Sequence, residues 1–152
     1  MSTITFNEHG LIVACPHCGH NNQLPFERLD VPPRCIKCTR DFLLPAEPVE
    51  LESEAALVAL IRRSAQPVLV DFSAPSCESP GIIAQEVSTI AAEGAGRWLV
   101  ARVNTEMLPE AAHHFAATSI PLLVLFRHGQ EIARNVGALP AAAVLRFLGQ
   151  VL

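Results

Sequence analysis

Five cysteines are the residues of this sequence whose type and spacing most clearly suggest chemistry. Four of them form two C-x-x-C pairs, Cys15-Pro-His-Cys18 and Cys35-Ile-Lys-Cys38, which are separated by sixteen residues. Two residues between thiolates let one tight turn present both sulfur atoms, and two such turns complete a tetrahedron around a metal ion. The spacing between the pairs is typical of zinc sites. The sequence therefore predicts one structural zinc per chain, bound by Cys15, Cys18, Cys35 and Cys38.

The same four cysteines could instead form disulfide bonds or redox-active dithiols. The doubled pattern lies in a segment with no evident core of its own, which argues against dithiols. Residues 1–10 lack the basic leader and apolar core of a secretory signal, so we expect a cytoplasmic protein, in which structural disulfides are uncommon. His9, His17 and His20 could also bind a metal, but four thiolates fill a closed site, and we expect these histidines to be exposed.

The fifth cysteine, Cys77, stands between a predicted strand and a predicted helix. Residues 68–72 form an apolar run interrupted by a single acid, Asp71, which is typical of a buried strand. Pro80 suits the first turn of a helix, where backbone N–H groups have no intrahelical partner to lose. A thiol at such a strand-to-helix turn lies near the positive end of the helix, which lowers the pKa of the thiol. Cys77 is therefore a candidate nucleophile.

Further strands and helices are expected on both sides of Cys77. Ser53 can cap a helix with one apolar face, and Pro109 and Pro140 suit the first turns of two later helices. The expected strands lie at residues 98–103, 122–126 and 131–136, the last two joined by a turn at 127–130. This alternation of strands and helices predicts a layered α/β domain.

The chain reads as a small module followed by a larger one. Residues 45–48, Pro-Ala-Glu-Pro, are typical of a short, stiff linker. We therefore expect a zinc ribbon at residues 1–46 and the α/β domain at residues 47–152.

Composition argues against two classes of partner. Half of the residues are hydrophobic, 17% are charged, and the net charge is −4, so there is no general electrostatic reason to bind nucleic acid or anionic membrane. No apolar run approaches the roughly 20 residues that span a bilayer. We expect neither nucleic acid nor a membrane as a partner.

The segment Ser76-Cys77-Glu78-Ser79-Pro80 resembles the active-site segment of the thioredoxin family, in which a strand, a turn and a helix carry Trp-Cys-Gly-Pro-Cys. The resemblance extends from about residue 49 to residue 152. It includes Val-Asp-Phe at 70–72, Val-Asn-Thr-Glu at 103–106, Ser-Ile-Pro at 119–121, Gly129 and Val-Gly-Ala at 136–138. With the two C-x-x-C pairs, the chain is similar to the zinc-containing thioredoxin 2 type. The resemblance implies a thioredoxin fold, preceded by a zinc ribbon, and a part in cell redox homeostasis.

The resemblance also implies where a polypeptide substrate would lie. The family's proline loop corresponds to Ile120 and Pro121, so a cis peptide bond is expected between these residues, facing Cys77. The expected lining of the substrate groove is Ser76, Ile120, Pro121, Gly137 and Ala138.

The resemblance gives Asp71 a candidate role as well. This residue matches the buried acid that assists proton transfer in active thioredoxins. Because no resolving thiol is present to deprotonate, we expect instead a core acid satisfied by a hydrogen bond or a nearby base. Arg102, on the adjacent predicted strand, is a candidate charge partner.

The motif departs from the family in ways that bear on catalysis. Reduction of a disulfide by a dithiol needs a second thiol to release the product, and Pro80 stands at that position. Pro80 also has no N–H to donate to a Cys77 thiolate, and Glu78 places a negative charge beside the sulfur. Ser73 and Ser76 stand where the family usually has tryptophan.

Three functions are consistent with these residues. The first is protein-disulfide reduction, which the resemblance supports and the missing thiol opposes. The second is monothiol exchange, in which Cys77 forms a mixed disulfide with a partner. The third is a non-catalytic module that binds an extended polypeptide in the groove, with the zinc ribbon as a second contact surface. We favour the third.

Overall fold

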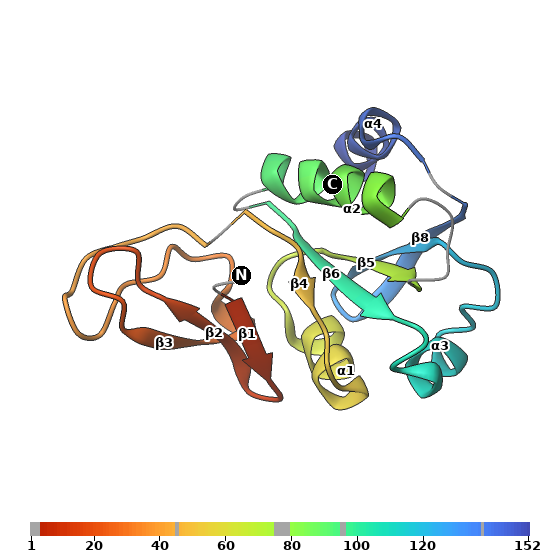
Figure 1. Ribbon diagram of the computed structural model, residues 1–152. Helices are drawn as coiled ribbons and strands as arrows, with labels where there is room; N and C mark the ends of the chain where they lie inside the picture. The colour runs from red at the N-terminus through yellow and green to blue at the C-terminus, as the bar shows by residue number, and fades with distance from the viewer. Residues whose placement is uncertain (1–3, 45, 75–79, 95–96, 138) are drawn as a thin grey trace.

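Two separate sheets organise the chain. The computed structural model describes residues 4–44, 46–74, 80–94, 97–137 and 139–152, with the backbone alone for residues 6 and 80–84. The first sheet is a three-stranded antiparallel meander, and the second has five strands (Figure 1). The strands of the first sheet are β1 (Ile4–Asn7), β2 (Gly10–Ala14) and β3 (Asn21–Pro25).

The five-stranded sheet has the order β4-β6-β5-β7-β8, with β5 at its centre. Strand β5 is parallel to β6 and antiparallel to β7, so the sheet is mixed. All six residues of β5 are buried, as a central strand covered on both faces requires. The strands are β4 (Val49–Glu50), β5 (Val68–Ser73), β6 (Leu99–Asn104), β7 (Leu122–Arg127) and β8 (Gln130–Val136).

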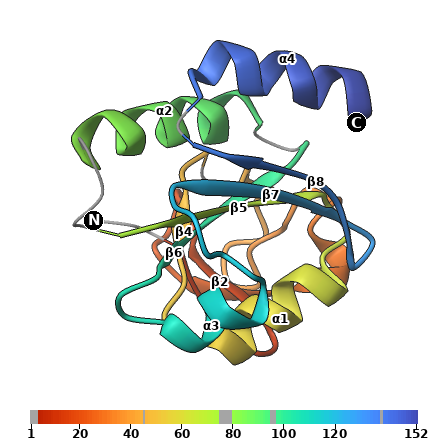
Figure 2. The same ribbon diagram turned by 90° about the vertical axis from the view of Figure 1, so that its right-hand side faces the viewer.

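Helices cover both faces of this sheet. Helices α1 (Glu54–Arg63) and α3 (Pro109–His114) lie on one face, and α2 (Pro80–Glu93) and α4 (Ala141–Val151) lie on the other (Figures 1 and 2). The predicted layered α/β architecture is confirmed. No helix within the described ranges is both long and apolar enough to cross a bilayer.

Local chemistry explains several of the element ends. The Ser53 hydroxyl accepts a hydrogen bond from the N–H of Ala56 at 3.1 Å and caps α1, as expected. Helix α2 is described from Pro80 onward, but residues 75–79 lie outside the described residues, so the place of Pro80 in the first turn stays a prediction. Between β7 and β8, His128 and Gly129 both have positive φ (52° and 79°), which is the backbone that a two-residue hairpin turn requires.

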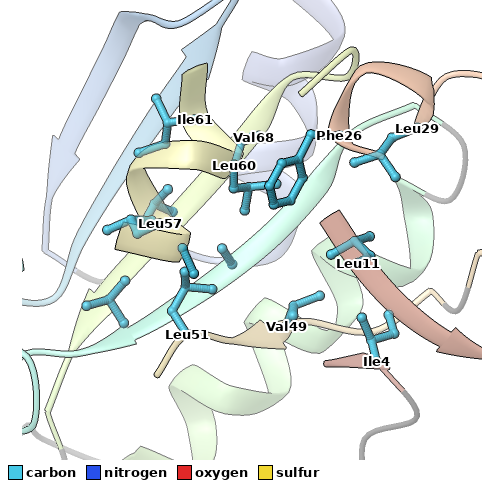
Figure 3. Packing of buried hydrophobic residues seen from close by; sticks show 14 of the residues in the cluster. Ile4, Leu11, Phe26, Leu29, Val49, Leu51, Leu57, Leu60, Ile61 and Val68 are labelled. Carbon is cyan, nitrogen blue, oxygen red and sulfur yellow. The ribbon is translucent and has the colours of Figure 1, made fainter. Parts of the chain in front are cut away.

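The N-terminal segment packs against the larger sheet. Its short 3-10 helix η1 (Phe26–Arg28) follows β3 and places Phe26 inside a hydrophobic cluster that also contains residues of α1 and β5 (Figure 3). The apolar side chains of the segment therefore share a core with the α/β part. Pro45, the first residue of the expected linker, lies outside the described residues, and the division at residues 46 and 47 stays a prediction.

A second hydrophobic cluster fills the opposite face of the sheet. It joins α2 and α4 to the strands and contains Trp98, the only tryptophan of the sequence. The Trp98 side chain is 4% exposed, and its indole N–H donates to the carbonyl oxygen of Ile90 at 3.2 Å. Residues 69, 100 and 125 on three neighbouring strands point into this cluster.

Candidate functional site

The four cysteines of the two C-x-x-C pairs lie together. Their sulfur atoms are all within 4.8 Å of one another. The distance between the sulfur atoms of Cys15 and Cys38 is 3.7 Å, and that between Cys18 and Cys35 is 3.5 Å. Zinc–sulfur bonds of about 2.3 Å in a tetrahedron require sulfur atoms about 3.8 Å apart. These residues therefore fit a single tetrahedral metal ion, and none of the four cysteines is in a disulfide.

The backbone of each C-x-x-C turn stabilises a thiolate. The N–H of His17 donates to the sulfur of Cys15, and the N–H of Lys37 donates to the sulfur of Cys35, each at 3.4 Å. The backbone N–H of Cys38 is the main cause that lowers the pKa of Cys35 to about 5, against the opposing effect of burial. Such thiolates are the form of cysteine that binds a metal ion.

The pKa of Cys18 is shifted in the opposite direction from that of Cys35. The N–H of His20 lowers the pKa of Cys18, but burial and the hydrogen bond to Cys35 outweigh it and raise that pKa to about 11. Cys18 therefore holds its proton more strongly than Cys35 does. A divalent cation would replace these protons and favour the thiolate form of all four ligands.

The nearby histidines are not part of the candidate metal site among the described residues. His9 and His17 are exposed, and His20 is partly buried. Among the described residues, the group placed to hold a metal ion consists of cysteines alone.

Asp71 is the buried acid of the central strand. Its side chain is 1% exposed, and its Oδ2 lies 3.2 Å from Nε of Arg102, the residue directly opposite it on β6. The hydroxyl of Ser73 donates to the same oxygen at 3.4 Å. The expectation of a core acid satisfied by a hydrogen bond and by a base thus matches the observed contacts, and Arg102 is that base.

Two opposing effects act on the ionisation of Asp71. Burial raises the pKa of its carboxyl group above the ordinary value, and it is the larger effect. The guanidinium of Arg102 and the hydroxyl of Ser73 oppose burial, while Glu50 adds to it. Glu50 lies on β4, with its carboxylate 3.9 Å from Nη1 of Arg102. The balance leaves the pKa raised.

The structure places three of the predicted groove residues close together. The peptide bond between Ile120 and Pro121 is cis, as predicted. The N–H of Gly137 donates to the carbonyl oxygen of Pro121 at 2.8 Å, which joins the proline loop to the end of β8. All three residues are partly exposed. Ser76, Cys77 and Ala138, predicted to complete the groove, lie outside the described residues, and the roles of the whole set stay predictions.

A cavity of about 260 Å³ opens on the face of the sheet that α4 covers. Its lining among the described residues is apolar apart from Arg134 and Asn135. The other lining residues are Leu69, Leu123, Leu125, Ala133, Leu139, Val144 and Phe147. The cavity belongs to the packing of α4 against β7 and β8, and its described lining does not include the residues of the proline loop.

Comparison with protein families gives the larger part of the chain a clear relationship. The family model described as Thioredoxin matches residues 48–150. The chain belongs to the thioredoxin family. The match runs from just before β4 to the last but one residue of α4, so it includes every strand of the five-stranded sheet.

Individual members of the thioredoxin family extend this relationship. Thioredoxin C-3 of Corynebacterium nephridii is 35% identical over 142 residues, which cover 93% of this chain and 96% of that protein. A thioredoxin of Mycobacterium bovis is 39% identical over 99 residues, which cover 65% of this chain and 85% of that protein. The first alignment is long enough to include much of the N-terminal segment with its four cysteines.

A solved structure supports the thioredoxin fold. A mutant thioredoxin from Halobacterium salinarum matches with a TM-score of 0.63 at 24% identity, covering 70% of this chain and 91% of that one. The predicted thioredoxin fold, a mixed sheet flanked by helices, is confirmed, and the four-cysteine cluster is compatible with a preceding zinc ribbon.

Sequence reasoning missed two residues of β8 whose side chains bind backbone carbonyl groups beside the proline loop, one after α3 and one at Gly137. Arg134 donates to the carbonyl oxygens of Phe115 and Ala116 at 2.9 and 3.3 Å, where α3 has just ended. Asn135 donates to the carbonyl oxygen of Gly137 at 3.3 Å. In the sequence both residues are ordinary members of a polar edge strand. Their contacts depend on chain segments far apart in the sequence, and no local pattern marks them.

Proposed function

We propose that this protein is a thioredoxin-like module that binds an extended polypeptide and does not reduce disulfides by turnover. The observation that carries the proposal is the gathering of Cys15, Cys18, Cys35 and Cys38 in one cluster that fits a metal ion. The sequence has five cysteines, so this cluster leaves Cys77 as the only thiol outside it. The motif therefore lacks the second sulfur atom that dithiol chemistry needs.

The missing sulfur has a defined consequence for the reaction. Attack by a Cys77 thiolate on a partner disulfide forms a bond between Cys77 and one partner sulfur, and the other partner sulfur leaves as a thiolate. Release of the bound partner needs a second thiolate to attack the mixed disulfide. Pro80, at the position of the family's second cysteine, supplies none. The mixed disulfide would persist until an external thiol resolved it.

The environment of Asp71 supports the same proposal. Burial raises the pKa of Asp71, which is the direction that proton transfer near the working pH would favour, so the support for this proposal lies in the contacts of Asp71 and not in its pKa. Here the Asp71 carboxylate has an arginine at 3.2 Å and a hydroxyl at 3.4 Å, which together satisfy it as a structural acid. The pair with Arg102 supports a role in holding β5 and β6 together.

Monothiol exchange through Cys77 is the second candidate function. Its support is that the relatives of this chain are named thioredoxins. In this case a small thiol or a partner protein would complete the reaction that Cys77 begins.

We further infer that the cluster binds one structural zinc ion and that the chain is a divergent protein of the thioredoxin 2 type. Zinc would cross-link the two C-x-x-C turns and so hold the N-terminal segment folded. Four reduced thiolates require a reducing compartment, which favours the cytoplasm. Metal analysis of the purified protein should give about one zinc per chain, and a metal-free folded protein under reducing conditions would contradict this site.

Insulin reduction with dithiothreitol tests the polypeptide-binding proposal. We expect no catalytic turnover by the natural sequence above the rate with dithiothreitol alone. Pro80→Cys returns the second sulfur, and this variant should have measurable activity. The double variant Cys77→Ser with Pro80→Cys should have none. Turnover by the natural sequence that Cys77→Ser removes would refute the binding-module proposal and favour the exchange function.

A trapping experiment separates binding from exchange. A peptide that contains a single activated disulfide should form a stable mixed disulfide with the natural sequence if Cys77 is reactive, and none with Cys77→Ser. A peptide without cysteine should bind both proteins equally if binding is non-covalent. Binding of neither peptide would contradict both candidate functions.

A further inference from the structure

The segment between the two C-x-x-C pairs is also the segment that contacts the thioredoxin-like part of the chain. Residues 19–34 include β3 and η1, and a metal bound by all four cysteines would close this segment into a loop. Closing a loop restricts the unfolded chain and so favours the folded form of what the loop contains. This loop contains Phe26 and Leu29, which are fully or almost fully buried in the cluster shared with the thioredoxin-like part (Figure 3).

Two hydrogen bonds join this loop to the connection between α1 and β5. The carbonyl oxygen of Phe26 accepts from the N–H of Ala65, and the carbonyl oxygen of Leu29 accepts from Nε2 of Gln66, each at 2.9 Å. The Gln66 side chain is 5% exposed, so its amide has left water for this contact. Strand β5 begins two residues later. The loop thus holds the entry to the central strand.

Arg63, at the end of α1, adds a third connection. Its guanidinium donates to both carboxylate oxygens of Glu27 at 2.5 and 3.2 Å, and to the carbonyl oxygen of Glu8 at 2.9 Å. The same group lies over the Phe26 ring, with 5.5 Å between the guanidinium carbon and the ring centroid. One side chain therefore contacts both η1 and the turn between β1 and β2.

Asn22 connects these contacts to the cysteine turns. Its side chain is 2% exposed, and its Oδ1 accepts from the N–H of Ile36, inside the second C-x-x-C turn, at 3.1 Å. Its amide group donates to the carbonyl oxygen of His20, just after the first turn, at 3.1 Å. Asn22 lies on β3, which leads directly into η1. A continuous set of contacts therefore runs from both cysteine turns to Ala65 and Gln66.

We propose that the N-terminal ribbon is a metal-dependent clamp on the entry to β5. Metal binding holds β3 and η1 in place, and η1 in turn holds the end of α1 and the start of the central strand. Loss of the metal would then destabilise the thioredoxin-like part as well as the ribbon. The inference rests on the zinc site proposed above and extends it to the stability of the distant sheet.

Trp98 offers a readout that is separate from the ribbon. It is the only tryptophan, and it lies in the cluster under α2 and α4, on the opposite face of the sheet from η1. Urea unfolding of the full chain would be followed by Trp98 fluorescence under reducing conditions, with zinc bound and after chelation. We expect the urea midpoint to fall on chelation. The N–H of Ala65 should exchange with solvent deuterium about tenfold faster or more.

Variants at the interface keep the four ligands and test the connection itself. The double variant Arg63→Gln with Gln66→Leu removes the side-chain contacts to Glu27 and Leu29. We expect it to bind zinc as the natural sequence does, but its Trp98 midpoint should shift much less on chelation. Arg34→Gln is the matched control, because the ion pair that Arg34 forms among the described residues is with Asp41, inside the ribbon, and this variant should keep the full shift.

The outcomes distinguish the clamp from the metal site. Zinc content would be measured on the same samples. If the natural sequence holds zinc but its Trp98 midpoint is the same after chelation, the clamp is refuted and the zinc site stands. If the interface variant shows the same shift as the natural sequence, the contacts of Arg63 and Gln66 do not carry the effect, and the clamp as proposed is also refuted. If the natural sequence holds no zinc, the proposed metal site is refuted, and the clamp, which depends on it, is refuted with it.

Discussion

Replacement of Arg102 by methionine tests what the buried acid does. The Asp71 side chain is 1% exposed and lies 3.2 Å from Arg102, whose own side chain is 21% exposed. Removal of one member of a fully buried ion pair costs about 3–5 kcal/mol, because the remaining charge is left without compensation. The arginine is partly solvated here, so we expect the lower end of that range. Arg102→Met should lower the free energy of unfolding by about 3 kcal/mol at pH 8.

The loss should depend on pH in a defined direction. Burial already raises the pKa of Asp71, and the arginine that opposes this effect is removed, so the pKa rises further. A group whose pKa is higher in the folded state favours folding more at low pH, where it is protonated in both states, and this advantage is lost as pH rises through the folded pKa. The variant should therefore lose least stability near pH 5 and most near pH 8.

Urea unfolding followed by Trp98 fluorescence, measured between pH 5 and pH 8, provides the assay. Adding Asp71→Asn to Arg102→Met removes the uncompensated charge and should recover most of the loss at pH 8. The Arg34 and Asp41 pair is the matched control, since both side chains are more than half exposed, and Arg34→Met should leave the free energy of unfolding nearly unchanged at any pH. A loss that is independent of pH, or that Asp71→Asn does not reduce, would refute the reasoning.

Three further substitutions test the packing, each by urea unfolding. In Gly94→Ala the new Cβ would lie 2.1 Å from the indole nitrogen of Trp98, so we expect a loss of about 2 kcal/mol and altered fluorescence. Glu86→Ala removes the carboxylate that accepts from the first N–H of α4, at Ala141, and should cost about 1 kcal/mol. Phe26→Ala empties a fully buried site in the shared core and should cost about 3–5 kcal/mol. Losses below about 0.3 kcal/mol in any of them would contradict the packing described.

The parts of the site that depend on local spacing could be predicted from the sequence. Each C-x-x-C pair forms a local turn that presents two sulfur atoms, and the four-cysteine cluster forms where the two turns lie side by side. The strand at β5 and the helix cap at Ser53 likewise follow from residues that are neighbours in the chain. Arg102 could be named as the partner of Asp71 because parallel neighbouring strands bring these positions opposite each other.

The way the N-terminal segment packs could not be predicted in the same manner. Its strands are four or five residues long, and an alternation of apolar and polar residues over so short a stretch does not identify a strand. Phe26 lies within the predicted zinc ribbon, yet its side chain is buried in a cluster that includes residues of α1. Contacts such as Gln66 to Leu29 span 37 positions of sequence, and only tertiary packing brings them together. The sequence predicted a segment without a core of its own. It could not show that the apolar residues of this segment share a core with the rest of the chain.

The observed contact of Ser73 bears on the proposal that the active site is divergent. Ser73 is almost fully buried at the end of β5, and its hydroxyl donates to Asp71. A tryptophan, usual in the family at this position, could not make that hydrogen bond from the same space, so the serine and the paired acid form one arrangement. Restoring the second thiol with Pro80→Cys leaves this arrangement in place. If that variant recovers turnover, proton transfer at this site does not need a free Asp71. If it stays inactive, the Ser73, Asp71 and Arg102 contacts become the next cause to test, because they fix the only buried acid of the central strand in an ion pair.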